Sequence, residues 1–293
     1  MTRRFRLTDI IYIIMMIIPI CFGILMKVFT TPPSEGISIS GARIYFTVPM
    51  PLQNMPVTES QVNSAIVIAV LFFLCLYLTH GIRYGVWLKR HHFAEIIVEM
   101  CTNLVKNNMG EYFKSFAPFI ASILALSGLS SLITLFGLFP PTSDINIIAG
   151  WAIIVFILIT YYKMKCGLWE YAKSFANPVL MAPLNIIGEI ATPVSMAFRH
   201  YGNVLSGSVI SVLVAAGLQG LSNIVFGALP GFLGEFPFLQ VGLPAILSIY
   251  FDIFSGCLQA FIFAMLTMLY IAGGFPLELY EERKKKKAQK CKN

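Results

Sequence analysis

The sequence has few charged residues, and this scarcity sets its class. Only 12% of its 293 residues are charged, whereas a soluble domain carries about 25%. Hydrophobic residues make up 57% of the chain, and no polar stretch is long enough to form a separate soluble domain. The composition therefore excludes an ordinary soluble protein and predicts one integral membrane unit.

Several chemical motifs are also missing, and each absence narrows the function. The six cysteines are scattered without CxxC spacing, so we predict neither a disulfide nor a metal site at them. His91 and His92 are adjacent and would point in different directions on a helix, which argues against a metal site there. No internal repeat and no nucleotide-binding motif is visible. We therefore expect no cofactor in this chain.

The basic residues are unevenly distributed along the chain. The formal net charge is +7 at pH 7, which in a soluble protein would indicate an acidic substrate or a nucleic acid. Here most of the positive charge lies in three clusters, as expected of cytoplasmic loops, and we expect no nucleic-acid partner. The clusters are Arg3 to Arg6, the segment from Arg83 to Lys114, and the tail from Arg283 to Lys292.

Six apolar stretches can cross a membrane, since a spanning helix needs about 20 apolar residues. They cover roughly 9–29, 62–79, 116–139, 147–163, 179–218 and 239–274. The first stretch has a second interpretation as a signal peptide, because basic residues precede it. Its long apolar run and the lack of an A-x-A cleavage site favour an uncleaved span.

The positive-inside rule gives a predicted orientation. With the N-terminus inside, six crossings return the basic C-terminal tail to the inside, and residues 30–61 lie outside with Arg43 as their one basic residue. We therefore predict a multi-pass protein of the cell membrane, with both termini cytoplasmic if residues 9–29 are an uncleaved span. The predicted regions are an extra N-terminal helix (1–30), an extracytoplasmic loop (31–61), a core membrane domain (62–278) and a basic cytoplasmic tail (279–293).

Two of the connections have predicted structure of their own. Outside, "ISISGARIYFTVPMP" alternates and is rich in β-branched and aromatic residues, which favours a short hairpin. Inside, residues 92–109 form an amphipathic pattern that predicts a helix along the cytoplasmic interface. Its apolar face holds Phe93, Ile97, Met100 and Leu104. Contact with the rest of the chain and docking of a partner both remain open for this face.

Two of the predicted helices are longer than the membrane requires. Residues 179–218 are about 40 helix-compatible residues, roughly 60 Å long, and the hydrocarbon core is about 30 Å thick. Such a helix must tilt far beyond the usual ~20° or break, and Pro183 and Pro193 are candidate kinks near its cytoplasmic end. The stretch from Val241 to Gly274 is also long, so we predict two long, strongly tilted helices.

Polar residues form a stripe on each long helix. On the first, Asn185, Ser195, Arg199, Asn203 and Ser206 recur at near-helical spacing. On the second, Asp252, Ser255 and Gln259 share one face.

The predicted orientation assigns depths to these polar residues. Ser208 and Asp252 would lie on the outer side, Asn185 and Glu189 on the inner side, and Arg199 between them. This pattern is typical of two aqueous half-channels separated by a cation, because an arginine cannot lose its charge on burial and intramembrane ionisable residues mark ion paths. The alternative is an Arg199 neutralised by Asp252 with no transport role. His200 faces about 100° away from Arg199, so a packing role is as good an interpretation as a relay.

At these residues the sequence resembles a known family. "PLNIIGEIATPVSMAFRHYGNVLSG" followed by "DIFSGCLQAFIFAMLTMLYI" is similar to subunit a of the F-type ATP synthase, bacterial type, the membrane stator that faces the rotating c-ring. The resemblance extends from about Val62 to the end of the last helix. It implies an all-α fold of five family transmembrane helices and one interfacial helix, to which the extra N-terminal helix is added, with the two long helices facing the c-ring.

The resemblance also implies roles for residues of the central region. Arg199 matches the family's essential arginine, which attracts the c-ring carboxylate, favours release of its ion and blocks leakage between the half-channels. Gln259 matches the glutamine beside that arginine, and Asn203 an asparagine of the same stripe. Ser208 and Asp252 match an outer pair that commonly holds Glu and His, so here one member alone is ionisable.

Some positions differ from the family pattern, and one further loop resembles it. Asn185 stands where many relatives carry a glutamate at the inner half-channel, and Glu189 is the candidate to serve instead. "FPPTSDINI" resembles the family's loop with Asp and Asn, here Asp144 and Asn146, which are candidates for access to the channel. "RHYGN" departs from the usual leucine and phenylalanine after the arginine.

The expected function is translocation of an ion, by default a proton, in a complex with the c-ring, the subunit b stator stalk and the remaining ATP synthase subunits, within membrane lipid. ATP chemistry would belong to those partners. A proton- or sodium-coupled secondary transporter is the alternative, in which Arg199 binds an anionic substrate, although such proteins often show internal repeats. A non-transporting scaffold is a third possibility, and it would tolerate replacement of Arg199.

Overall fold

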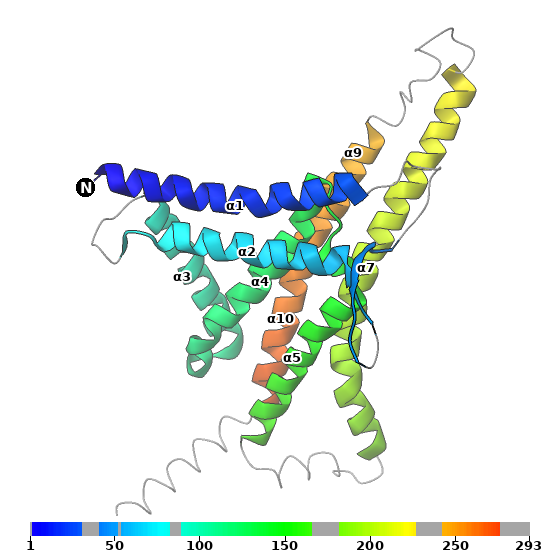
Figure 1. Cartoon of the computed structure of the whole chain (residues 1–293). Coiled ribbons are helices and arrows are strands. Elements are labelled where there is room, and N and C mark those ends of the chain that lie inside the picture. The colour runs from blue at the N-terminus through cyan, green and yellow to red at the C-terminus, as the bar shows by residue number, and fades with distance from the viewer. Residues whose placement is uncertain are drawn as a thin grey trace, which may run out of the picture. The chain divides into compact units, whose positions relative to one another are not determined.

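The protein is almost entirely helical in the computed structural model, which describes residues 2–30, 41–51, 54–82, 89–165, 182–226 and 242–275. The predicted basic tail (279–293) lies outside these residues. Figure 1 shows the helices, and their bounds are α1 (Thr2–Thr30), α2 (Glu59–Thr79), α3 (Lys89–Met109), α4 (Ala117–Leu132), α5 (Ile145–Met164), α7 (Ala182–Phe226), α9 (Leu243–Ser248) and α10 (Gly256–Gly274). The prediction of an all-α membrane protein is confirmed.

Short segments connect or extend these helices. Three 3₁₀ helices are η2 (Glu111–Phe116), η3 (Ile133–Phe136) and η4 (Pro141–Ser143), and a π-helical segment, η7 (Ile249–Ser255), joins α9 to α10. Strands β1 (Ile44–Val48) and β2 (Met55–Thr58) pair antiparallel, with Val48 opposite Met55. The predicted hairpin is therefore confirmed, although its second strand begins beyond the stretch that predicted it.

Six helical segments of the described chain are long and apolar enough to cross a membrane, as predicted. They are Leu7–Thr30, Glu59–Thr79, Glu111–Phe136, Ile145–Met164, Ala182–Val225 and Leu243–Gly274. The protein is thus a multi-pass membrane protein. Their apolar side chains are largely exposed in the isolated chain, as expected for surfaces that lipid covers.

Helix α7 extends further than the sequence indicated. It contains 45 residues and ends at Phe226, whereas Leu218 was the predicted end. Gln219, Ser222 and Asn223 resembled a loop, but polar residues continue a helix when nothing breaks it. Pro193 lies inside α7, while Pro183 occupies the first turn, where its missing N–H costs no hydrogen bond. Pro183 is therefore not a kink.

The predicted helix of residues 92–109 forms as part of α3, and the exposure of its residues differs from face to face. Cys101, Val105 and Met109 are buried, while Phe93 and Met100 of the predicted apolar face remain 57% and 64% exposed. Burial raises the pKa of the Cys101 thiol above its ordinary value. Helix α3 thus has one face against the protein and a neighbouring apolar face that is open, as an interfacial helix in contact with lipid would have.

The chain folds as two compact units, each of which is described by itself. The first comprises residues 1–97, 122–144 and 200–261, and the second comprises residues 98–121, 145–199 and 262–293.

In the first unit, α1 runs antiparallel beside α2 (Figure 1). Ile66, Val67, Ile133 and Leu138 form a buried cluster that Ile20 of α1 contacts. Gly23 permits this approach, because a Cβ there would lie 2.7 Å from Ile66 Cδ1. At the far end of α1, the Lys27 ammonium donates to the Gly137 carbonyl oxygen.

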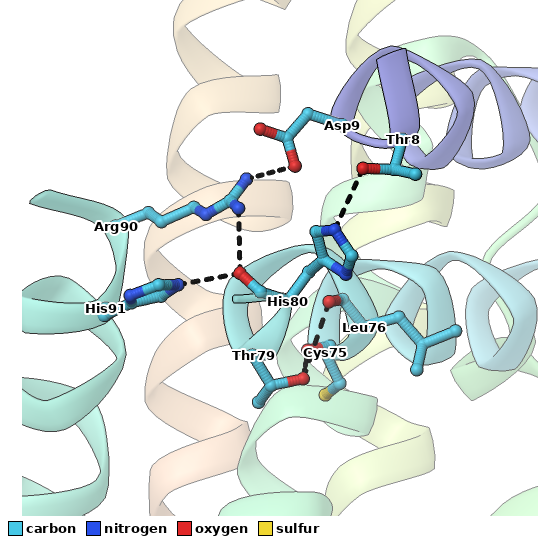
Figure 2. A network of polar contacts seen from close by, with 8 residues as sticks. All are labelled: Thr8, Asp9, Cys75, Leu76, Thr79, His80, Arg90 and His91. Carbon is cyan, nitrogen blue, oxygen red and sulfur yellow. Dashed lines mark hydrogen bonds and ion pairs between the residues drawn. The ribbon is translucent and has the colours of Figure 1, made fainter. Parts of the chain in front are cut away.

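A polar network holds the other end of α1, as Figure 2 shows. Arg90 Nη1 lies 2.6 Å from Asp9 Oδ1, and its Nη2 donates to the His80 carbonyl oxygen at 2.8 Å. His91 Nε2 lies 2.9 Å from the same carbonyl, and Thr8 Oγ1 lies 2.9 Å from His80 Nε2. The Arg90 and Asp9 side chains are 10% and 22% exposed. This network joins α1, α2 and α3 at one point.

We predict that Arg90→Gln lowers the free energy of unfolding by about 3 kcal/mol, because it leaves the mostly buried Asp9 carboxylate without its cation. The measurement is unfolding of the purified protein in detergent. His92→Gln is the matched control, since His92 is a neighbour on α3 with a 75% exposed side chain. Equal stability of the two variants would contradict the role of this network.

Candidate functional site

A small polar cavity in the first unit brings together several of the predicted site residues. Its polar wall comes from Asn203 and Ser208 of α7, Asp252 of η7, Ser131 of α4 and Thr134 of η3. The volume of about 20 Å³ suffices for about one water molecule, which needs two to four polar partners. The cavity can therefore hold a water molecule in hydrogen-bonding range of an ionisable group, as a proton relay requires.

Asn203 and Ser255 connect the two long helical stretches directly. Asn203 Nδ2 donates to Ser255 Oγ at 2.8 Å, and Ser255 Oγ lies 3.0 Å from Asn203 Oδ1. The side chains of both residues are half-buried. This reciprocal contact satisfies the Asn203 amide inside an apolar tract, where an unpaired polar group is costly.

Asp252 lies within the π-helical segment η7, a feature frequent at functional sites because it alters which side chains share a face. Ser248 Oγ, one turn earlier, donates to Asp252 Oδ2. The carboxylate is half-buried and lines the cavity. The geometry thus gives the cavity one ionisable group held by a neighbouring hydroxyl.

Two glycines bring the walls of this cavity together. A Cβ on Gly207 of α7 would lie 2.9 Å from Phe251 Cδ1, and a Cβ on Gly256 would lie 2.5 Å from Ser131 Cβ. Side chains at these positions would therefore push apart the elements that carry Asp252 and its neighbours.

The remaining predicted residues of the first unit have clear positions. Ser208 donates its hydroxyl to the Leu205 carbonyl at 2.8 Å while it lines the cavity. Gln259 is 6% exposed on α10. His200 is fully buried, and its Nε2 lies 3.5 Å from Ser127 Oγ, so His200 faces the interior as a packed, polar-contacting side chain.

Arg199 belongs to the second unit and has an exposed side chain. Its neighbours on the same face of α7 are small or polar and exposed as well: Gly188, Ser195 and Ser206. Within the described part of its own unit, no carboxylate pairs with Arg199. Glu189, the acidic residue of that unit on α7, is already engaged by Lys163. The Arg199 side chain is therefore exposed and pairs with no carboxylate in the described part of its unit.

The predicted inner group contains a pair that the sequence did not indicate. Lys163 Nζ lies 2.8 Å from Glu189 Oε1 and 2.7 Å from Oε2. Asn185, one turn earlier on α7, is half-buried.

Of the two candidates for channel access, Asp144 has defined partners in the first unit. Ser60 Oγ donates to Asp144 Oδ2, and Thr58 Oγ1 lies 2.8 Å from the same Ser60 hydroxyl. Asn146 is exposed in the first turn of α5, in the second unit.

Glu59 is a residue near Asp144 that sequence reasoning missed. Its side chain is 3% exposed, and among the described residues no donor reaches its Oε1. Burial raises the pKa of the Tyr45 phenol, and the negative charge of Glu59 acts in the same direction. Asn63 Oδ1 and Thr142 Oγ1 are also buried without a hydrogen-bond partner in the described part of the chain. Buried oxygens without a partner among the described residues favour bound water.

The comparisons with known proteins agree with this arrangement. The family model described as ATP synthase A chain matches residues 61–272. The ATP synthase subunit a of Geotalea daltonii is 32% identical over 214 residues, which cover 71% of this chain and 83% of that protein.

Two further relatives extend the comparison. The ATP synthase subunit a of Trichlorobacter lovleyi is 28% identical over 230 residues, 74% of this chain and 89% of that protein. The protein named ATP synthase subunit a, sodium ion specific, of Propionigenium modestum is 27% identical over 277 residues, 84% of this chain and 87% of that protein. The match of the family model begins after α1 and the hairpin and spans both long helices. The chain therefore belongs to the ATP synthase A chain family, whose members translocate ions in the membrane sector of ATP synthase.

Proposed function

We propose that this chain moves an ion, by default a proton, through two half-channels at its interface with the c-ring and so couples the ion gradient to rotation. The observation that carries the proposal is Arg199, a permanently charged residue exposed on an apolar membrane helix. Exposure of such a charge to lipid alone would be heavily penalised. A passing carboxylate of the c-ring supplies the counter-charge and offsets that penalty.

The exposed face around Arg199 supports close approach of the ring. Gly188, Ser195 and Ser206 are small residues, which let another helix come near in a membrane. The family resemblance implies that Gln259, which is buried on α10, orients the contact with the ring from the second long helix.

The outer half-channel begins near Asp144 and reaches the cavity at Asp252. Ions enter beside the hairpin, where Glu59, Ser60 and Asp144 gather oxygen atoms, with Asn146 at the start of α5. They continue to the cavity lined by Asn203, Ser208 and Asp252. Because Ser208 is not ionisable, water in the cavity relays protons between Asp252 and the ring.

The inner half-channel passes Asn185 and Glu189 near the start of α7. An ion released from the ring beside Arg199 leaves toward the cytoplasm along these side chains. The fixed cation prevents direct passage between the two paths. Each charge that crosses yields about 2.3 kcal/mol per 100 mV, and this free energy drives rotation.

The assembly follows from this function. The c-ring contacts α7 and α10, the subunit b stator stalk and the remaining subunits hold the chain against rotation, and lipid covers the open apolar face of α3. Both termini lie in the cytoplasm, and α1, held at both ends by polar contacts, stays with the chain in the cell membrane. The relatives carry the name ATP synthase subunit a throughout, and no observation favours the secondary transporter or the scaffold.

Arg199→Gln should abolish ATP-driven ion pumping and ATP synthesis while the complex still assembles, because the ring carboxylate loses the cation that makes it release its ion. The measurement is pumping and synthesis in membrane vesicles that contain the whole complex. Arg43→Gln removes the same charge in the hairpin and should leave both activities intact. Normal coupled pumping by the Arg199 variant would contradict the proposed mechanism.

Gly207→Ala should reduce pumping at least about tenfold, because the added methyl group displaces Phe251 and with it the neighbouring Asp252. Gly220→Ala is the matched control on the same helix, since a Cβ there has no heavy atom within 4 Å and Gly220 lies near the end of α7, away from Arg199. Pumping rates normalised to assembled complex make the comparison. Equal rates for the two variants would remove the Asp252 cavity from the ion path.

A further inference from the structure

An ion pair in the second unit lies where one end of each of three helices meets. Lys163 stands one residue before the end of α5, and Glu189 lies near the start of α7. The Lys163 ammonium is within 2.8 Å of both carboxylate oxygens, and the two side chains are 26% and 16% exposed. Both oxygens of Glu189 are thus fixed by one donor group.

The last residue of α10 confines the lysine. A Cβ on Gly274 would lie 2.8 Å from Lys163 Cε and 3.0 Å from Lys163 Cγ. The aliphatic stem of Lys163 therefore runs directly over the Gly274 backbone. A lysine side chain is normally flexible, and this contact restricts its orientation toward Glu189.

The position of Glu189 along α7 also supports a role in ion transfer. Glu189 and Arg199 are ten residues apart on one continuous helix, a rise of about 15 Å. The Glu189 carboxylate is held in place by Lys163 and is partly exposed. It is therefore suited to accept an ion that leaves the neighbourhood of Arg199.

We propose that Lys163 is a positioning residue that holds Glu189 as the carboxylate receiving the ion released toward the cytoplasm. A proton that arrives through water forms an O–H bond at Glu189, and one of the two hydrogen bonds from Lys163 is lost. When the proton passes on to cytoplasmic water, that hydrogen bond forms again. This inference rests on the proposed function and adds to it a residue outside the two polar stripes.

The test is a double-mutant cycle in vesicles containing the whole complex, with ATP-driven pumping normalised to assembled c-ring. Lys163→Gln and Glu189→Gln should each reduce pumping about tenfold or more, because the receiving carboxylate is displaced or lost. The double variant should be no slower than Glu189→Gln alone, since Lys163 acts only through Glu189. Lys163→Arg should restore most of the rate.

Lys165→Gln is the matched control for charge. Lys165 lies two residues further along and donates to the Tyr112 hydroxyl at 3.1 Å. Its removal takes the same charge from the same end of α5 without touching Glu189, and it should leave pumping within about twofold of the unmodified rate.

A second route tests the same contact without changing any charge. Gly274→Ala should displace the Lys163 stem and reduce pumping, whereas Gly273→Ala, where a Cβ meets nothing within 4 Å, should not. The comparison of these two variants tests the position of the Lys163 side chain while its charge stays the same.

The outcomes distinguish this inference from the proposed function. Unchanged pumping in Lys163→Gln overturns the positioning role, as does a double variant whose loss is the product of the two single losses, because independent effects multiply. If Arg199→Gln abolishes pumping in the same vesicles, the proposed function stands while the role of Lys163 falls. If Arg199→Gln pumps normally, the function itself is wrong.

Discussion

One electrostatic constraint governs the structure: Arg199 carries a charge that it cannot lose, and it lies in an apolar membrane helix. A guanidinium stays protonated at any physiological pH, so Arg199 needs a counter-charge. Its side chain is exposed on α7, no carboxylate in the described part of its unit pairs with it, and Glu189, the carboxylate of that unit on α7, is held by Lys163. In the proposed complex the counter-charge arrives on the rotating partner, and the permanence of the charge separates the two ion paths.

Several polar side chains of the proposed ion path are likewise satisfied by a hydrogen bond to a neighbouring side chain. Asn203 and Ser255 satisfy each other, Ser248 holds Asp252, and Ser60 holds Asp144. Glycines allow neighbouring elements to approach closely at three places. Gly207 lies against Phe251, Gly256 against Ser131 and Gly274 against Lys163. These polar side chains are thus each positioned by a neighbour, as the proposed ion path requires.

Much of the fold could be predicted from the sequence, because apolar runs report membrane spans directly. The end of α7 was missed because Gln219 and Ser222 resemble a loop, and the π-helical turn around Asp252 has no signal in residue spacing. The stripe on α7 pointed to Asn203 and Arg199 because a helix repeats every 3.6 residues. Lys163 and Glu189 are 26 residues apart on different helices, and Glu59 resembles an ordinary acidic residue in a first helical turn. Contacts between elements therefore had to come from the structure.

If Arg199 keeps the two proposed half-channels apart, its loss should change the passive ion flux through the complex. The complex would be placed in vesicles with its c-ring fixed to the stator by a cross-link, so that rotation is blocked, and proton flux would be driven by a pH gradient without ATP. The complex with the unmodified chain should show no proton leak, and the Arg199→Ala complex should leak, because nothing then separates the outer path from the inner one. An Arg199→Ala complex that leaks no more than the unmodified one would show that Arg199 does not separate the two paths.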